Sequence, residues 1–386
     1  MKIKNPVKIF AILIGGVALV FFISSFVFSS NFSYSQSNAT TTEKIIKKET
    51  KHLKTPEPLK GIYMTQCVAS MPSFREKLVS LIGETELNAV IIDIKDYTGT
   101  VAFSGDGSGC KVSDMSQFVE ELHNKNIYVI GRVTVFQDPL YVKAHPELAV
   151  KRKSDGGVWK DKKGISFIDP GAKPFWDYIV SVATSSYAIG FDEINFDYIR
   201  FPSDGDMNDI YFSQTGTTTK KEMLRQFFEY LDSKFAGTGI VTSADLFGMT
   251  TTNKDDLGIG QILEYALENF DYVSPMVYPS HYPPKFNGWP DPNKVPYEIV
   301  KFSMDAAVAR DKFLKKEIAS STPNSILLKR INPLQLRPWL QDNDYPVHYT
   351  PAMVRAQIQA TYDSGLTSWM LWDPANTYTK EALLNK

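Results

Sequence analysis

Gly190–Pro202 reads Gly-Phe-Asp-Glu-Ile-Asn-Phe-Asp-Tyr-Ile-Arg-Phe-Pro, an apolar stretch that carries three carboxylates and one arginine. Its composition predicts a buried β-strand. At the two-residue period of a strand, Glu193, Asn195 and Asp197 share one face. Because Pro202 has no N–H and cannot continue a central strand, Asp197 lies near the carboxyl end of this strand. That end is where α/β folds place their functional groups.

The opposite face of the same strand begins with Asp192, which we expect to point toward surrounding helices in a structural role. Asp197 also has a plainer interpretation, in which it caps a loop or forms an ion pair with Arg200. Both interpretations depend on where the strand ends.

Short apolar runs alternate with amphipathic stretches of helical length after Leu59, which is typical of βα units around a parallel sheet. The eight expected strands are Gly61–Gln66, Ala89–Asp96, Tyr128–Phe136, Phe191–Phe201, Ile240–Phe247, Tyr272–Pro279, Leu336–Gln341 and Ser368–Trp372. The expected helices between them are Ser73–Glu86, Met115–Lys125, Pro174–Tyr187, Lys220–Phe235, Ile259–Asn269, Tyr297–Ile318 and Pro351–Asp363. This order predicts a (β/α)8 TIM barrel.

Two alternatives stay open at this point. A second apolar run, Ile326–Ile331, could replace Leu336–Gln341 as the seventh strand. A doubly wound open sheet is the competing fold, although no glycine-rich phosphate loop follows the first strand, as a dinucleotide-binding protein would require.

The chain of 386 residues is 43% hydrophobic and 13% aromatic, and its formal net charge is −1. It can bury a large core, and it has no basic surplus that would indicate nucleic-acid binding. Residues 1–8 form a basic flank and residues 9–28 an apolar run long enough to cross a lipid bilayer. We expect a single-pass anchor with a cytoplasmic flank, a cleaved signal sequence being the alternative.

The next segment, residues 29–58, is rich in Ser, Thr, Asn and Lys and predicts a flexible linker. Residues 59–386 would then form the barrel domain outside the membrane. An exported domain is compatible with a disulfide between Cys67 and Cys110, but two unpaired thiols are an equally good interpretation of the sequence. The oligomeric state is left open.

Polar residues follow most of the predicted strands, and the carboxyl ends of barrel strands converge on one mouth. The two strongest catalytic candidates are Asp197, as nucleophile or base, and Asp245 on the adjacent strand, as general acid. Such a pair of acids on neighbouring strands fits glycoside hydrolysis, in which carboxyl groups about 5 to 10 Å apart flank the scissile bond. Further candidates for catalysis or substrate contact are Asp93, Asn195, Arg132, Tyr278, His281, Trp339, Trp372 and Asp373.

Several of these residues also fit structural roles. Asp245 can cap the loop that follows it, and Asp93 can form a solvated pair with Lys95. Arg132 in an apolar strand fits an ion pair with Asp93 or with Glu193, a residue that lies deeper in the barrel than Asp197 and can anchor Arg132 or Lys95.

The aromatic candidates have a plainer interpretation as well, because large aromatic side chains fill the cores of most proteins. Trp339 and Trp372 can pack the barrel instead of stacking on sugar rings. Tyr278 and His281 belong to a proline-rich loop, where substrate contact and a structural role are equally compatible with the sequence.

Five motifs carry a resemblance to a known family: residues 190–202 above, Val-Ile-Ile-Asp-Ile-Lys-Asp at 90–96, Ser-Ala-Asp-Leu-Phe-Gly at 243–248, Arg-Pro-Trp-Leu-Gln at 337–341 and Trp-Met-Leu-Trp-Asp at 369–373. Together they resemble a bacterial family of glycoside hydrolases defined by the domain DUF4015. The resemblance implies an exported barrel related to the amylase-like hydrolases. By that analogy, Asn195 and Asp197 look like the Arg-x-Asp pair that ends the fourth strand in those enzymes, with Asp197 as nucleophile. Asp245 stands where they carry Glu, which leaves the identity of the acid open.

Two functions are therefore compatible with the sequence. The first is a membrane-anchored glycosidase that acts on a carbohydrate polymer, and the second is a non-catalytic barrel that binds glycans or serves as a scaffold of the cell envelope. Metal-dependent deacetylation is disfavoured, because the five histidines, His52, His123, His145, His281 and His348, lack the spacing of a ligand set. We expect neither a metal nor an organic cofactor.

Overall fold

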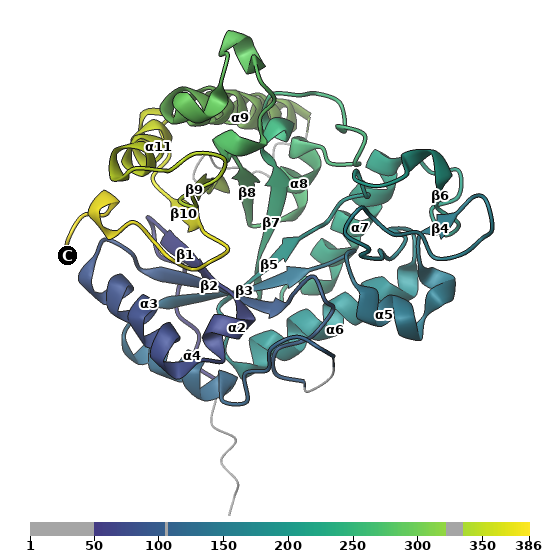
Figure 1. Ribbon diagram of the computed structural model, residues 1–386, viewed down its shortest axis with the longest axis horizontal. Helices are drawn as coiled ribbons and strands as arrows, with labels where there is room; N and C mark the ends of the chain where they lie inside the picture. The colour runs from purple at the N-terminus through teal and green to yellow at the C-terminus, as the bar shows by residue number, and fades with distance from the viewer. Residues whose placement is uncertain (1–49, 105–106, 322–334) are drawn as a thin grey trace, which may run out of the picture. The chain divides into compact units, whose positions relative to one another are not determined.

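Eight parallel strands close into a barrel, in the spatial order β1-β10-β9-β8-β7-β5-β3-β2 (Figure 1). The computed structural model describes residues 50–104, 107–321 and 335–386. The barrel strands are β1 (Lys60–Met64), β2 (Ala89–Lys95), β3 (Tyr128–Thr134), β5 (Glu193–Asp197), β7 (Val241–Phe247), β8 (Tyr272–Met276), β9 (Trp339–Gln341) and β10 (Trp369–Trp372). Each overlaps one predicted strand, so the (β/α)8 barrel is confirmed and an open sheet is excluded. The competing run at 326–331 lies outside the described residues.

Helices surround the barrel (Figure 1). They are α3 (Pro72–Glu84), α4 (Met115–Asn124), α6 (Lys173–Ile189), α7 (Lys220–Phe235), α8 (Leu263–Asn269), α9 (Pro296–Ser321) and α11 (Pro351–Asp363), and each overlaps a predicted helix. The elements that were not predicted from the sequence include two short helices and two short strands in the loops: α2 (Gln66–Ala69), α5 (Pro139–Ala144), β4 (Lys151–Arg152) and β6 (Ile210–Tyr211). The two helices span at most two turns and the two strands two residues each, too short for a hydrophobic period to be recognised.

The strands are buried on both faces, as parallel strands covered by helices must be. All seven residues of β2 are buried. On β5, Ile194 and Phe196 join the core between strands and helices, where Phe196 stacks on Phe235 of α7 with ring centroids 6.0 Å apart. A smaller apolar cluster that includes Ile91, Ile130 and Met370 packs separately from that core.

Strand β5 is shorter than predicted, and this correction positions the site. The strand ends at Asp197 and not at Phe201. Tyr198 has a positive φ of 52°, and its N–H donates to Oδ1 of Asp197 at 2.5 Å. The chain therefore turns at Asp197, and Tyr198 and Arg200 are released from the face that the strand period assigned to them.

The two faces of β5 are otherwise as expected. Asp192 points away from the mouth, and its carboxylate accepts hydrogen bonds from the backbone N–H groups of Leu53 (2.6 Å) and Val129 (2.8 Å) and lies 3.0 Å from Nε2 of His123. A carboxylate satisfied in this way has a structural role.

The predicted membrane segment, residues 9–28, lies outside the described residues. Among the residues that the structure does describe, no helix combines the length and apolarity needed to cross a bilayer. Residues 50–58, the end of the predicted linker, contact the barrel: Thr50 donates to the carbonyl of Ala188 at 3.1 Å, and the ring of His52 stacks on Tyr187 at 3.8 Å.

Cys67 and Cys110 form a disulfide. It joins α2, directly after β1, to the loop that follows β2. The equal alternatives left by the sequence are thereby resolved in favour of a cross-link at the carboxyl-terminal end of the barrel.

Candidate active site

Arg132 of β3 lies at the centre of the site, between three carboxylates from three other strands. Its Nη1 donates to Oδ1 of Asp93 at 2.6 Å, and its Nε donates to Oδ2 of Asp197 at 3.1 Å and lies 3.8 Å from Oδ2 of Asp245. Nη2 also donates to Asp197. Parallel register produces this convergence, because Arg132 pairs with Asp93 on β2 and with Asn195 on β5.

Asp245 is buried and is held through one oxygen. Its Oδ1 accepts hydrogen bonds from Nδ2 of Asn195 (2.9 Å) and from the indole N–H of Trp339 (2.8 Å). Burial, together with the negative charge of Asp197, raises the pKa of Asp245 well above its ordinary value, although Arg132, Asn195 and Trp339 oppose this shift. Asp245 therefore keeps its proton at a pH where exposed carboxylates have lost theirs, and Oδ2 is the oxygen free to carry it.

Asp197 accepts two hydrogen bonds on Oδ2, both from Arg132, and one on Oδ1 from the N–H of Tyr198. The expected alternative, a pair with Arg200, is wrong: the guanidinium of Arg200 donates to the carbonyl of Phe201 and to the hydroxyl of Ser203, both at 3.1 Å. Asp197 is therefore held on one oxygen by Arg132 and on the other by the turn that follows β5.

Asp93 is the third carboxylate of the cluster. It accepts from Arg132 and from the hydroxyl of Tyr63 on β1. Burial raises the pKa of Asp93, while Arg132 and Tyr63 oppose that rise. The expected pair between Asp93 and Lys95 is wrong, because β2 bulges between these two residues and turns Lys95 to Asp138, 2.9 Å away.

Glu193 does not reach Arg132 or Lys95 as the sequence analysis proposed. It accepts instead from Nη1 of Arg337 (2.9 Å) and from the hydroxyl of Tyr128 (3.2 Å) deeper in the barrel. Both partners come from strand starts or loops far apart in sequence, so strand spacing alone could not identify them.

The two tryptophan candidates differ in role. Trp339 is only 1% exposed and holds Asp245, so it cannot act as an open stacking surface. Trp372 is half-buried, stacks on Tyr63 with centroids 4.1 Å apart, and lies 5.3 Å from the guanidinium carbon of Arg132. Trp372 therefore presents one aromatic surface at the mouth.

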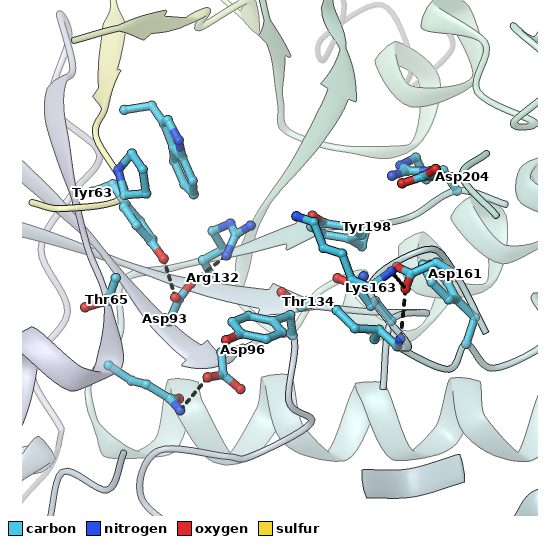
Figure 2. A pocket seen from close by; sticks show the side chains of 18 of the residues that line it. Tyr63, Thr65, Asp93, Asp96, Arg132, Thr134, Asp161, Lys163, Tyr198 and Asp204 are labelled. Atoms are coloured by element: carbon cyan, nitrogen blue, oxygen red, sulfur yellow. Dashed lines mark hydrogen bonds and ion pairs between the residues drawn. The ribbon is translucent and has the colours of Figure 1, made fainter. Parts of the chain in front are cut away.

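Two hollows open over this cluster. One, of about 300 Å³, is lined by Asp197, Asp245, Tyr278, His281 and Trp372, among others. The second, of about 700 Å³, is lined by Asp93 and by residues of the loops after β1, β2 and β3 (Figure 2). Arg132, Tyr198, Arg200, Ser203 and Trp372 line both.

The structure thus brings nine of the ten sequence candidates together around Arg132 and the smaller hollow, some of them as supports. Asp373 is the exception: its carboxylate accepts from the N–H groups of Ala375 (2.7 Å) and Thr377 (3.2 Å) and lines neither hollow. Tyr278 and His281 line the smaller hollow, where burial raises the pKa of Tyr278 well above its ordinary value.

Tyr198 and Arg200 were not predicted as site residues, although both line the two hollows. The two-residue period of a strand running to Phe201 placed both residues on the outer face. The one sequence signal for an earlier strand end was Pro202, and β5 in fact ends before it, at Asp197. In the described part of the chain, no group of three or more His, Cys, Asp or Glu side chains is arranged to hold a metal ion. The positive charge beside the three carboxylates comes from Arg132.

Fold and site define a (β/α)8 barrel with an arginine-linked carboxylate cluster at the carboxyl ends of its strands. The model of the DUF4015 family, described as "Putative glycosyl hydrolase domain", matches residues 61–378. The chain belongs to this family of glycoside hydrolases, and the resemblance read from its motifs is confirmed.

Solved structures extend the comparison. A hypothetical protein from Ruminiclostridium thermocellum ATCC 27405 is 31% identical over 51% of this chain and 98% of its own, with a TM-score of 0.41. The PgaB (BpsB) glycoside hydrolase domain from Bordetella bronchiseptica is 14% identical over 82% of this chain and 94% of its own, with a TM-score of 0.57. The catalytic domain of β-amylase from Paenibacillus polymyxa is 10% identical, covering 85% and 95%, with a TM-score of 0.50. No curated protein matches the chain.

Proposed function

We propose that this protein hydrolyses a polysaccharide outside the cytoplasm, with Asp245 as general acid and Asp197 as the carboxylate that attacks the sugar. The observation that carries the proposal is the unequal pair itself. Asp245 is buried, has a raised pKa and retains a free oxygen, whereas Asp197, its neighbour, is bound to Arg132. Two acids whose environments differ in this way can take the acid and the base or nucleophile roles of one reaction.

The proposed chemistry uses both oxygens that face Arg132. Oδ2 of Asp245 gives its proton to the glycosidic oxygen while the bond to the anomeric carbon breaks, and the carboxylate of Asp197 forms the new bond to that carbon. Arg132 then stabilises whichever of the two carboxylates carries the charge. In the second half of the reaction, Asp245 takes a proton from a water molecule. The oxygen of that water bonds to the anomeric carbon and displaces the carboxylate of Asp197.

The spacing of the two acids supports direct attack by Asp197. Both Oδ2 atoms lie close to Nε of Arg132, at 3.1 Å and 3.8 Å. These two oxygens can be no further apart than the two distances laid end to end, which is compatible with the roughly 5 to 5.5 Å between the carboxyl groups of retaining glycosidases.

The test is release of reducing ends from polysaccharides, including peptidoglycan and common α- and β-glucans, by the purified chain. We expect Asp197→Asn and Asp245→Asn each to lower kcat by at least roughly a hundredfold, since general acid–base catalysis alone contributes about 10² to 10⁴. Circular dichroism checks that both variants fold, and Asp373→Asn, outside the cluster, is the matched control. Proton NMR should show that the product, as first released, has the same anomeric configuration as the substrate.

Wild-type turnover in the Asp197→Asn protein would remove this residue from the mechanism. Saturable glycan binding without cleavage of any polymer would instead support the second function, a glycan-binding or scaffold barrel. The two carboxylates converge on one guanidinium instead of pointing apart, and this convergence favours the catalytic function.

We also propose that residues 9–28 hold the chain in a membrane with the barrel on the extracytoplasmic side. The disulfide between Cys67 and Cys110 supports an exported domain, because such bonds persist in oxidising compartments.

A further inference from the structure

The larger hollow adjoins the proposed point of cleavage and is more than twice the volume of the hollow over Asp197 and Asp245, about 700 Å³ against about 300 Å³. Figure 2 shows its two sides: Tyr63, Asp93 and Asp96 on one, and Tyr198 and Asp161 on the other. Because five residues, Arg132 among them, line both hollows, the larger hollow extends the site next to the catalytic carboxylates.

The rim of the larger hollow carries an exposed aromatic side chain, Tyr97, in the turn after β2. Tyr97 is 56% exposed and lines the hollow. Among the described residues it makes none of the ring contacts or hydrogen bonds found for most tyrosines of the chain. An aromatic ring left in solvent beside a hollow contributes nothing to the core, but it offers an apolar face to a ligand.

The turn that carries Tyr97 is held on both sides. The carboxylate of Asp96 accepts from Nε2 of Gln66 and from the N–H of Thr98, both at 2.9 Å. Gly99 follows with a φ of 85°, and a Cβ there would clash with the side chain of Asp138. Cys67, which also lines the hollow, is fixed by its disulfide. The ring is thus presented from a rigid wall, as a binding platform requires.

The charged residues that line the hollow are nearly balanced in sign, with four Asp, two Arg and one Lys. Several of these charges are already compensated within the protein: Asp93 by Arg132, and Asp204 by Lys162 at 3.0 Å. A hollow without a strong net field suits hydroxyl-bearing, uncharged sugar units better than a highly charged polymer.

We propose that the larger hollow binds the sugar units that adjoin the cleaved bond, with Tyr97 stacking on one of them. The substrate class is then a chain of several uncharged hexose or N-acetylhexosamine units, not a disaccharide or a single terminal unit. The placement of these sugar units next to a cleaved bond rests on the proposed function. The binding of the oligosaccharide can be measured without any cleavage.

The experiment uses the full chain with Asp197→Asn and isothermal titration with malto-, cello- and chito-oligosaccharides of two and six units. We expect at least one six-unit chain to bind more tightly than its two-unit counterpart. Adding Tyr97→Ala should weaken six-unit binding roughly threefold to tenfold, the range typical of one aromatic stacking contact, and leave two-unit binding unchanged. Tyr97→Trp should restore it, and Tyr211→Ala, which removes a tyrosine 51% exposed on β6, should have no effect.

Equal affinity of six-unit chains with and without the Tyr97 ring would overturn the proposal, as would equal weakening of both lengths or no binding of any series. Failure of the proposed function looks different: the wild-type chain would bind the six-unit sugar through Tyr97 and release no reducing ends from it.

Discussion

At the scale of single residues, the chemistry of the site depends on which carboxylates accept hydrogen bonds from Arg132. Asp93 and Asp197 accept hydrogen bonds from Arg132, while Asp245 lies 3.8 Å from the Nε of that arginine. The carboxylate that receives least compensation is also buried, and its pKa is raised well above the ordinary value. One guanidinium therefore gives three chemically identical side chains different degrees of charge compensation.

Trp339 offers a test of this inequality. Its indole N–H stabilises the ionised form of Asp245. Trp339→Phe should therefore raise the pKa of Asp245 further, so that the acid stays protonated to higher pH. We expect the alkaline limb of kcat/KM to move up by roughly one pH unit or more, since a hydrogen bond to a charged group contributes about 1.5 to 3 kcal/mol.

The pH profile of hydrolysis measures this shift, and a merely structural role of the indole would lower activity without moving the limb. The matched control is Trp176→Phe on α6, whose indole N–H donates to the carbonyl of Pro170 at 2.8 Å, away from the site. A limb that stays in place or moves to lower pH would contradict the assignment of Asp245 as the acid.

At the scale of elements, the loops at the carboxyl ends of the strands make the site larger than the strands alone would. Strand β4, in the loop after β3, pairs with β6, in the loop after β5, beside a small apolar core of Val150, Trp159, Phe167 and Ile210. On the other side, the disulfide fixes α2 to the loop after β2. Residues of these loops line the larger hollow together with residues at the strand ends, so its shape depends on the loops as well as on the barrel.

The disulfide should contribute measurably to stability, because it closes a loop with a sequence separation of 43 residues. The chain-entropy relation gives about 4 kcal/mol for a loop of this length. We expect the double variant Cys67→Ser/Cys110→Ser to have a free energy of unfolding lower by about that amount, measured by urea denaturation. The wild-type chain in reductant is the control and should approach the value of the variant. Coincident unfolding curves with and without reductant would show that the bond adds no stability.

At the scale of the whole molecule, closure of the barrel unites residues from every part of the chain. Asp93, Arg132, Asp197, Asp245 and Trp372 are spread over most of the domain sequence, and the closed order of the strands places them over one pair of hollows. The same closure brings residues 50–58 against β3, where Thr55 lies 3.0 Å from the hydroxyl of Tyr128.

Anchoring is tested on the full chain in a bacterial host. We expect it to remain in the membrane pellet after an alkaline carbonate wash, because an apolar run of this length inserts as a helix, and to be degraded by protease added to spheroplasts. A variant that begins at Thr50 behind a cleavable signal is the control and should be soluble outside the cytoplasm. A shortened wild-type chain in the medium would show instead that residues 9–28 are a cleaved signal.

The amino-acid sequence by itself determined the eight strands, the inward face of Glu193, Asn195 and Asp197, and the two acids of the proposed mechanism. It could do so because strand period, apolar burial and the proline at 202 are local properties of the chain. Only the tertiary structure decided that Arg132 binds Asp197, that Trp339 holds Asp245 and that Glu193 pairs with Arg337. These partners lie between 65 and 144 residues apart, and their meeting depends on the register and closure of the barrel, which no local pattern encodes.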